Sequence, residues 1–111
     1  MERLCFTFDI APGTEADYDR LHKEIWPELA TAILDVGYRG YSLFRRDTSV
    51  ICVCECHPDV ATVRRLMQER HQVLTDQWNV AMQDIIVRMT DIDGDPFEYP
   101  LCWHLPEDEL S

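Results

Sequence analysis

The stretch YRGYSLFRRDTSVICVCEC, residues 38–56, determines the predicted fold because it contains two strand patterns in direct succession. Tyr38 to Arg46 and Val50 to Cys56 are rich in strand-forming residues. Between them, Asp47-Thr48-Ser49 is a polar connection of hairpin length. We therefore predict an antiparallel hairpin near the middle of the chain, and the fold follows from what flanks it.

On the N-terminal side of this hairpin, the sequence predicts one strand and the start of a helix. Arg3 to Ile10 alternates in the manner of a half-buried strand, and residues 11–13, Ala-Pro-Gly, are typical of a turn. Thr14 with Asp17 three positions later predicts a capping box at the start of the helix.

The expected first helix has apolar and aromatic residues that recur with the helical period, namely Tyr18, Leu21, Ile25, Leu29, Ala32, Ile33 and Val36. Gly37 is typical of a helix end. Pro27 removes a backbone donor inside the pattern, so we predict a kink near Trp26 and a second segment that begins with Pro27.

On the C-terminal side, residues 60–87 predict a second long helix or a broken pair of helices. Residues 91–96 are loop-like in composition, and Leu101 to Leu105 is an apolar stretch that we expect to form a last strand. The order is then β-α-β-β-α-β, the ferredoxin-like pattern of an α+β protein, in a single domain over residues 1–111 with an acidic tail from about Glu107. Both helices would cover one face of the antiparallel sheet and leave its other face uncovered. We therefore predict that a second copy covers this face, which gives a homodimer, a dimeric α+β barrel.

The composition excludes some classes of binding partner. The net charge is −11, which argues against nucleic acid and anionic membrane surfaces and leaves a small molecule as the expected ligand. The first residues have no leader pattern, no apolar run is long enough to span a membrane, and the five cysteines are an odd number. We therefore expect a cytoplasmic protein with reduced thiols.

Two motifs resemble metal sites, and we expect neither to bind a metal. Cys52, Cys54 and Cys56 alternate on one strand face, unlike the paired cysteines of structural zinc sites, and are expected in the core. Residues 91–95, Asp-Ile-Asp-Gly-Asp, have an early glycine and lack the bidentate glutamate of a calcium loop.

One cluster is suited to chemistry on a small ligand. Tyr18, His22 and Trp26 are four residues apart, so a regular helix would align them on one stripe. An imidazole with a pKa near 6.5 exchanges protons close to neutral pH. The structural alternative is that the two aromatic rings simply flank the core, and spacing alone leaves both interpretations open.

Tyr18, His22, the run Ile-Trp-Pro-Glu at residues 25–28, Tyr41 and Trp78 together resemble the L-rhamnose mutarotase family of small dimeric ferredoxin-like enzymes. The resemblance implies that His22 is the proton donor and that Tyr18 and Tyr41 contact the sugar. It also implies a tryptophan pair on the second long helix, which here is Trp78 followed by Asn79.

The activity implied by this resemblance is isomerisation of a monosaccharide without cofactor or metal. Opening and reclosing the pyranose ring by acid–base catalysis interconverts the α and β anomers. Trp78 offers a flat face to a 6-deoxy sugar, and Asn79 offers hydrogen bonds where a ring would stack. L-Rhamnose is the expected substrate, with L-fucose as the alternative.

Two other function classes are compatible with the predicted fold. A haem-degrading or cofactorless monooxygenase shares this dimeric architecture, and a haem titration would distinguish it. A non-enzymatic sugar-binding dimer would keep the aromatic residues but would not depend on His22.

Overall fold

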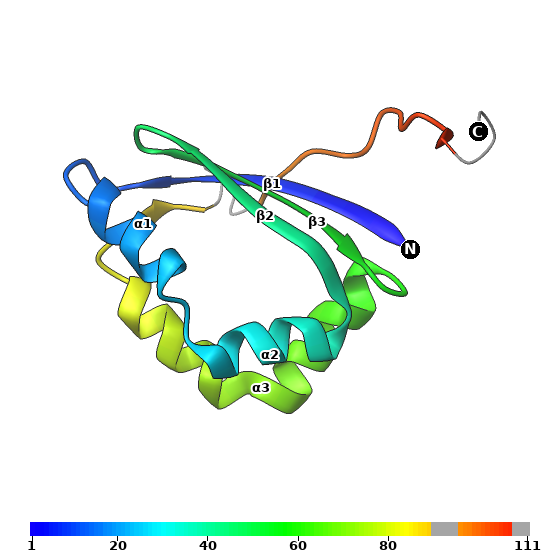
Figure 1. Ribbon diagram of the computed structural model, residues 1–111, viewed down its shortest axis with the longest axis horizontal. Helices are drawn as coiled ribbons and strands as arrows, with labels where there is room; N and C mark the ends of the chain where they lie inside the picture. Colours follow the sequence, from blue (N-terminus) through cyan, green and yellow to red (C-terminus); the bar gives the residue numbers. More distant parts are fainter. Residues whose placement is uncertain (90–95, 108–111) are drawn as a thin grey trace.

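The computed structural model describes residues 1–89 and 96–107, and within them the chain is an antiparallel α+β fold. The helices and strands follow in the order β1 (Glu2–Ile10), α1 (Glu15–Lys23), α2 (Pro27–Val36), β2 (Tyr38–Arg46), β3 (Ser49–Cys56), α3 (Val60–Met82), β4 (Ile86–Arg88) and β5 (Phe97–Glu98). Figure 1 shows α2 and α3 opposite one face of the sheet, with α1 at one end. The ferredoxin-like class predicted from the sequence is confirmed.

The sheet has β1 and β3 at its centre. The strand order is β2-β3-β1-β4, and β5 pairs with the same edge of β1 as β4. In the β1–β3 register, Leu4 lies opposite Cys54 and Phe8 opposite Val50, and all four side chains are buried. Because side chains alternate along a strand, this register directs the even-numbered residues of both strands toward the helices.

The expected first helix is divided at the predicted place. Helix α1 ends at Lys23, and α2 begins with Pro27 at its first position, where the missing N–H costs no hydrogen bond. Gly37 ends α2 with a left-handed φ of 116°. A Cβ atom at Gly37 would lie 2.1 Å from the carbonyl oxygen of His57, so the position requires glycine.

The predicted capping box at Thr14 is wrong. Thr14 is the residue before α1, but its side chain makes no cap hydrogen bond to the helix. The hydroxyl instead donates to the carbonyl oxygen of Ala11 at 2.6 Å, which closes the preceding turn. The Thr14 hydroxyl, which the sequence pattern assigned to the helix cap, therefore stabilises the preceding turn instead.

The C-terminal half differs from the prediction in two respects. Helix α3 ends at Met82 rather than near residue 87 and has non-helical dihedrals at His71, and β4 follows at once and pairs with β1. The predicted strand from Leu101 to Leu105 is wrong, since this segment has no regular structure and Trp103 is 70% exposed. The strand in this region is β5, which pairs with the middle of β1. Residues 91–95 and the tail beyond residue 107 lie outside the described residues.

The core lies between the sheet and the helices. One cluster packs Phe8, Ile10, Tyr18, Val50, Met82 and Ile85, and the other packs Leu4, Val36, Cys54, Cys56 and Val63. Cys52 is also fully buried, so the prediction that the three strand cysteines belong to the core is confirmed. Within residues 1–89 and 96–107, no group of three or more potential ligands is placed to hold a metal ion. None of the described helices combines the length and the apolar character needed to cross a bilayer.

Candidate active site

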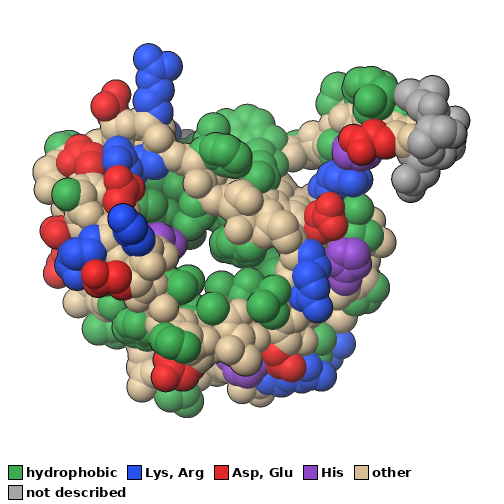
Figure 2. Space-filling model, in the orientation of Figure 1, with side chains coloured by type: hydrophobic (Ala, Val, Ile, Leu, Met, Phe, Trp, Pro, Cys, Tyr) green, Lys and Arg blue, Asp and Glu red, His purple; other side chains and the backbone are tan. Residues whose placement is uncertain are grey.

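A cavity of about 500 Å³ lies between the sheet and the helices. Figure 2 shows an opening through the middle of this face of the molecule, surrounded largely by hydrophobic side chains. The described residues that line the cavity come from β1, α1, the link between α1 and α2, α2, β2, α3 and the segment around β4: Phe6, Phe8, Tyr18, His22, Ile25, Leu29, Ile33, Tyr41, Leu43, Trp78, Asn79, Met82, Ile86 and Met89. The five residues predicted from the sequence to form the site, Tyr18, His22, Tyr41, Trp78 and Asn79, all lie on its wall.

Helix α1 supplies Tyr18 and His22, which are one helical turn apart. The two rings have centroids separated by 4.3 Å, and His22 Nδ1 lies 3.0 Å from the carbonyl oxygen of Tyr18. A carbonyl oxygen only accepts hydrogen bonds, so Nδ1 carries the hydrogen. The neutral imidazole therefore has its lone pair on Nε2, which is the nitrogen available to a ligand.

The aromatic rings of His22, Trp78 and Trp26 form a continuous contact chain. The His22 and Trp78 centroids are 5.4 Å apart and the Trp78 and Trp26 centroids 5.1 Å apart, both with edge-to-face geometry. Trp26 is absent from the described lining of the cavity. It precedes Pro27 directly and supports Trp78 from behind, so the break between α1 and α2 positions a ring that faces the cavity.

The hydroxyl of Tyr18 is buried without a partner. The side chain is only 3% exposed, and no described group accepts or donates a hydrogen bond at Oη. Burial raises the pKa of this phenol far above its ordinary value, so it stays protonated. A buried hydroxyl without a hydrogen bond costs free energy, and the packing of the Tyr18 ring against Phe8 and His22 offsets that cost.

Tyr41 faces the same cavity because of an irregularity in β2. The β2–β3 register shifts between Arg39 and Ser42, where Gly40 has a φ of 58°. Such a bulge redirects the neighbouring side chains. The ring packs edge-to-face on Tyr38 with centroids 5.4 Å apart, and Tyr41 remains 41% exposed.

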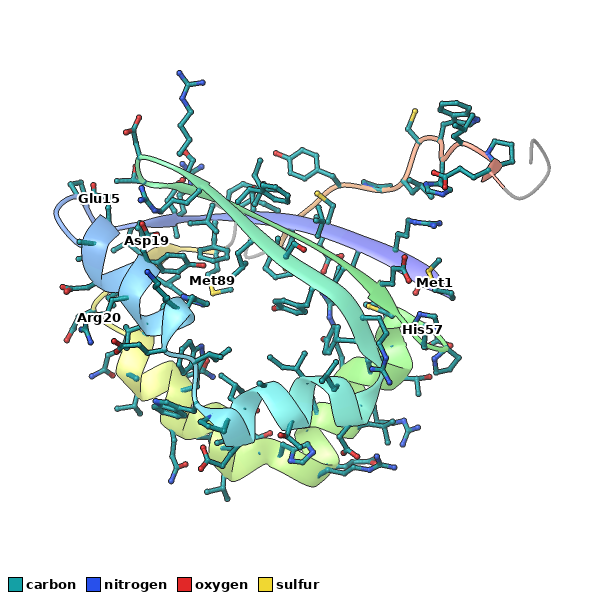
Figure 3. All side chains as sticks on the ribbon, in the orientation of Figure 1. Met1, Glu15, Asp19, Arg20, His57 and Met89 are labelled. Atoms are coloured by element: carbon teal, nitrogen blue, oxygen red, sulfur yellow. The ribbon has the colours of Figure 1, made fainter. Side chains whose placement is uncertain are left out.

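Helix α1 is attached to the edge strand by a charged pair. Arg45 on β2 donates to both carboxylate oxygens of Asp19, through Nε at 2.7 Å and Nη2 at 2.5 Å. The hydrogen bond from Arg45 lowers the pKa of the Asp19 carboxyl, which therefore remains charged. Asp19 lies next to Tyr18 in α1 and is labelled in Figure 3.

Several lining residues were not predicted from the sequence. Once the faces that border the cavity are known, the lining residues of two elements can be derived. Strand alternation places Phe6 and Phe8 on that face of β1, and the helical period places Leu29 and Ile33 on that face of α2. Ile86 and Met89 belong to the segment that was expected to be helical or loop, so no local pattern indicated them.

A second cavity, of about 420 Å³, lies on the opposite face of the sheet. Arg3, Cys5, Val53 and Glu55 line it together with the segment around Tyr99. It contains none of the predicted site residues and no described histidine. Of these two cavities, only the first brings a histidine and the predicted aromatic residues together in its described lining.

The fold and the site together define a class of protein, a small ferredoxin-like α+β protein with an aromatic cavity and one histidine on its wall. The family model described as "L-rhamnose mutarotase" matches residues 3–104 of this chain. The chain belongs to the L-rhamnose mutarotase family.

Individual relatives are similar over almost the whole chain. The L-rhamnose mutarotase of Acidiphilium cryptum strain JF-5 is 36% identical over 110 residues, which cover 96% of this chain and 100% of that protein. That of Burkholderia ambifaria strain MC40-6 is 32% identical over 112 residues, with the same coverage. The monooxygenase and the non-enzymatic binder considered from the sequence receive no support from these relatives.

Two solved structures share the fold. The crystal structure of an L-rhamnose mutarotase from Formosa agariphila has a TM-score of 0.64 at 24% identity and covers 95% of this chain and 97% of its own. Tetracenomycin F2 cyclase from Streptomyces glaucescens, a type-II polyketide cyclase, has a TM-score of 0.67 at 18% identity and covers 96% and 100%. At these identities the two structures establish the architecture alone.

Proposed function

We propose that this chain is a cofactor-independent isomerase that interconverts the α and β anomers of L-rhamnose, with His22 as its proton carrier. The observation that carries the proposal is the His22 imidazole on the cavity wall, with Nδ1 held by the Tyr18 carbonyl and Nε2 left for the ligand. Family membership supports the reaction and the sugar.

One imidazole is sufficient for the proton transfers. Nε2 accepts the proton of the anomeric hydroxyl while the bond between C1 and the ring oxygen breaks, and the electron pair of that bond goes to the ring oxygen. Both oxygens are bonded to C1, so the imidazolium is close enough to return the proton to the ring oxygen. Rotation of the aldehyde and the reverse steps on its other face give the second anomer.

The remaining predicted residues would bind the sugar. The hydroxyls of Tyr18 and Tyr41 would hydrogen-bond to sugar oxygens, and Tyr18 Oη has no other described partner. Trp78, supported by Trp26, would pack against the apolar side of the ring and its methyl group. Asn79 would hydrogen-bond to a sugar hydroxyl beside Trp78.

Saturation-transfer NMR on L-rhamnose and L-fucose tests the activity. We expect enzyme-dependent exchange between the anomeric resonances of L-rhamnose, with weaker exchange for L-fucose. The absence of added exchange for L-rhamnose at micromolar protein would contradict the proposal. Exchange for L-fucose alone would keep the reaction but change the substrate.

We also propose that the chain forms a homodimer through the outer face of the sheet. Phe44 and Ile51 lie opposite each other on β2 and β3 and are 60% and 42% exposed, and Trp103 is 70% exposed. Burying such apolar surface against a second copy is favourable. Light scattering should give twice the 13.0 kDa mass of the chain, and Phe44→Lys should lower it. Val73→Lys on α3 is the matched control, and a monomeric native protein would contradict the dimer.

We place the activity in the cytoplasm. The described cysteines are free thiols, as expected in a reducing compartment. Fractionation of cells that produce the chain without a tag should recover it with the cytosolic proteins.

A further inference from the structure

Helix α3 is bent at His71. The backbone dihedrals there, φ −132° and ψ 27°, are not helical, and the Thr75 hydroxyl donates to the His71 carbonyl oxygen at 2.9 Å. A hydroxyl that bonds to the carbonyl four residues earlier often bends a helix. Figure 1 shows α3 running beneath α2 and then turning toward α1. The bend divides α3 into a first segment, residues 60–70, and a second segment, residues 72–82.

The two segments of α3 pack on different parts of the core. Val63, in the first segment, is buried in one core cluster, and Met82, in the second segment, is buried in the other. Trp78, Asn79 and Met82 line the cavity, and its described lining includes no residue of the first segment. The direction of the second segment therefore determines one wall of the cavity.

A charged contact between α2 and α3 lies at the bend. His71 Nε2 is 2.9 Å from Oδ2 of Asp35, which is the last residue but one of α2. Arg70 Nη1 lies 3.4 Å from the same oxygen. The side chain of His71 is 26% exposed and that of Asp35 is 45% exposed. The residue that interrupts the helix is therefore also the one that contacts the neighbouring helix.

Asp35 is unfavourably placed within α2 itself. A carboxylate near the C-terminus of a helix lies at the negative end of the helix dipole, and residues 33–36, Ile-Leu-Asp-Val, include no basic residue. The hydrogen bond from His71, with a smaller contribution from Arg70, lowers the pKa of the Asp35 carboxyl, which therefore stays charged at neutral pH. The groups that stabilise this charge belong to α3, so the contact connects the two helices.

We propose that the contact between Asp35 and His71 positions the second segment of α3, and with it Trp78 and Asn79, for sugar binding. This inference rests on the proposed mutarotase function, in which those two side chains bind L-rhamnose. His71 is absent from the described lining of the cavity and lies about two helical turns before Trp78, so it acts through the direction of the helix. The proton carrier His22 is held within α1, so the contact affects binding more than proton transfer.

Exchange kinetics on Asp35→Ala and His71→Ala at several L-rhamnose concentrations test the positioning role. Each variant should raise KM roughly threefold to tenfold, the value of one aromatic contact, and keep kcat within about twofold of the wild type. Because both residues act through one contact, the double variant should have the KM of a single variant. Glu69→Ala is the matched control, since Glu69 pairs with Arg65 inside the first segment, and it should keep the wild-type KM.

The outcomes separate this inference from the proposed function. If the wild type exchanges L-rhamnose and both single variants keep its KM, the contact positions nothing and only the mutarotase function stands. The same holds if Glu69→Ala raises KM equally, or if the two single effects multiply in the double variant. If the wild type exchanges no L-rhamnose, the function and the inference both fail.

The indole N–H signals of the tryptophans give a second readout, which is independent of turnover. Trp78 packs on Trp26 with ring centroids 5.1 Å apart, whereas Trp103 is 70% exposed in the C-terminal segment. In Asp35→Ala and His71→Ala without sugar, the NMR signal of the Trp78 indole should shift and that of Trp103 should not. An unchanged Trp78 signal in both variants would overturn the inference, because the second segment would then keep its position without the contact.

Discussion

His22 Nδ1 lies 3.0 Å from the carbonyl oxygen of Tyr18, one turn earlier in α1. This contact determines which nitrogen of the ring carries the proton in the neutral state. We expect the ¹⁵N spectrum of the free protein with a neutral His22 ring to show the Nδ1–H tautomer. A spectrum dominated by the Nε2–H tautomer would show that the nitrogen facing the cavity is a donor, and the proposed direction of the first proton transfer would be wrong.

Tyr18→Phe should separate stability from function. The variant removes a buried hydroxyl that has no described partner, so the melting temperature should stay the same or rise. The free energy of unfolding should increase by at most about 1–3 kcal/mol. KM for L-rhamnose should increase, because the variant lacks the hydroxyl that would hydrogen-bond to the sugar. Calorimetry and exchange kinetics on the same sample measure the two effects. A lower melting temperature with unchanged KM would contradict the assigned role.

The elements that were predicted correctly from the sequence are determined by local backbone chemistry. Proline fixes φ and lacks an N–H, so Pro27 starts α2 wherever the rest of the chain lies. Gly37 ends the helix because only glycine fits its φ of 116° and the nearby His57 carbonyl. The site residues of α1 were predictable for the same reason, since Tyr18 and His22 are one helical turn apart.

The elements that were missed depend on distant pairing. The helical period continues past Met82, and nothing local indicates that Ile86 leaves the helix to pair with Ile10. The apolar residues Leu101 and Trp103 suggested a strand, yet both are exposed. β1 pairs with Phe97 and Glu98 instead. Tertiary context decides such short strands, and for that reason the β4 side of the cavity was not predicted.

The pair formed by Asp19 and Arg45 should affect turnover through the position of α1. Asp19→Asn weakens the bidentate contact that holds this helix to β2, so His22 should be less well placed and kcat should fall several-fold. The effect should appear in kcat more than in KM, and NMR should report increased mobility in α1. Asp17→Asn is the matched control, since Asp17 is in the same helix but makes only an exposed 3.8 Å pair with Arg20. Equal kcat values in the two variants would contradict the positioning role.

Asp59 should make the start of α3 sensitive to acid. Its carboxylate accepts a hydrogen bond from the Thr62 N–H at 2.7 Å, and hydrogen bonds from Thr62 lower the pKa of the Asp59 carboxyl below its usual value. A lowered pKa means that the stabilisation is complete above about pH 4, the unfolded value, and is lost as pH falls through the folded value.

Asp59→Ala should therefore melt a few degrees below the wild type at pH 7, and the difference should shrink toward pH 3. Asp59→Asn keeps a capping oxygen and should be intermediate at pH 7. Differential scanning fluorimetry at both pH values measures the effect. A difference that stays constant between pH 7 and pH 3 would show that the carboxylate charge does not contribute.

The central claim is that His22 carries the proton in anomer exchange, and His22→Ala tests it most directly. Saturation-transfer NMR on L-rhamnose should show exchange with the wild type and a loss of roughly a hundredfold to ten-thousandfold in the variant. Sugar binding, measured in parallel by ligand-detected NMR, should persist. Exchange at the wild-type rate in a folded His22→Ala protein that still binds L-rhamnose would contradict the account.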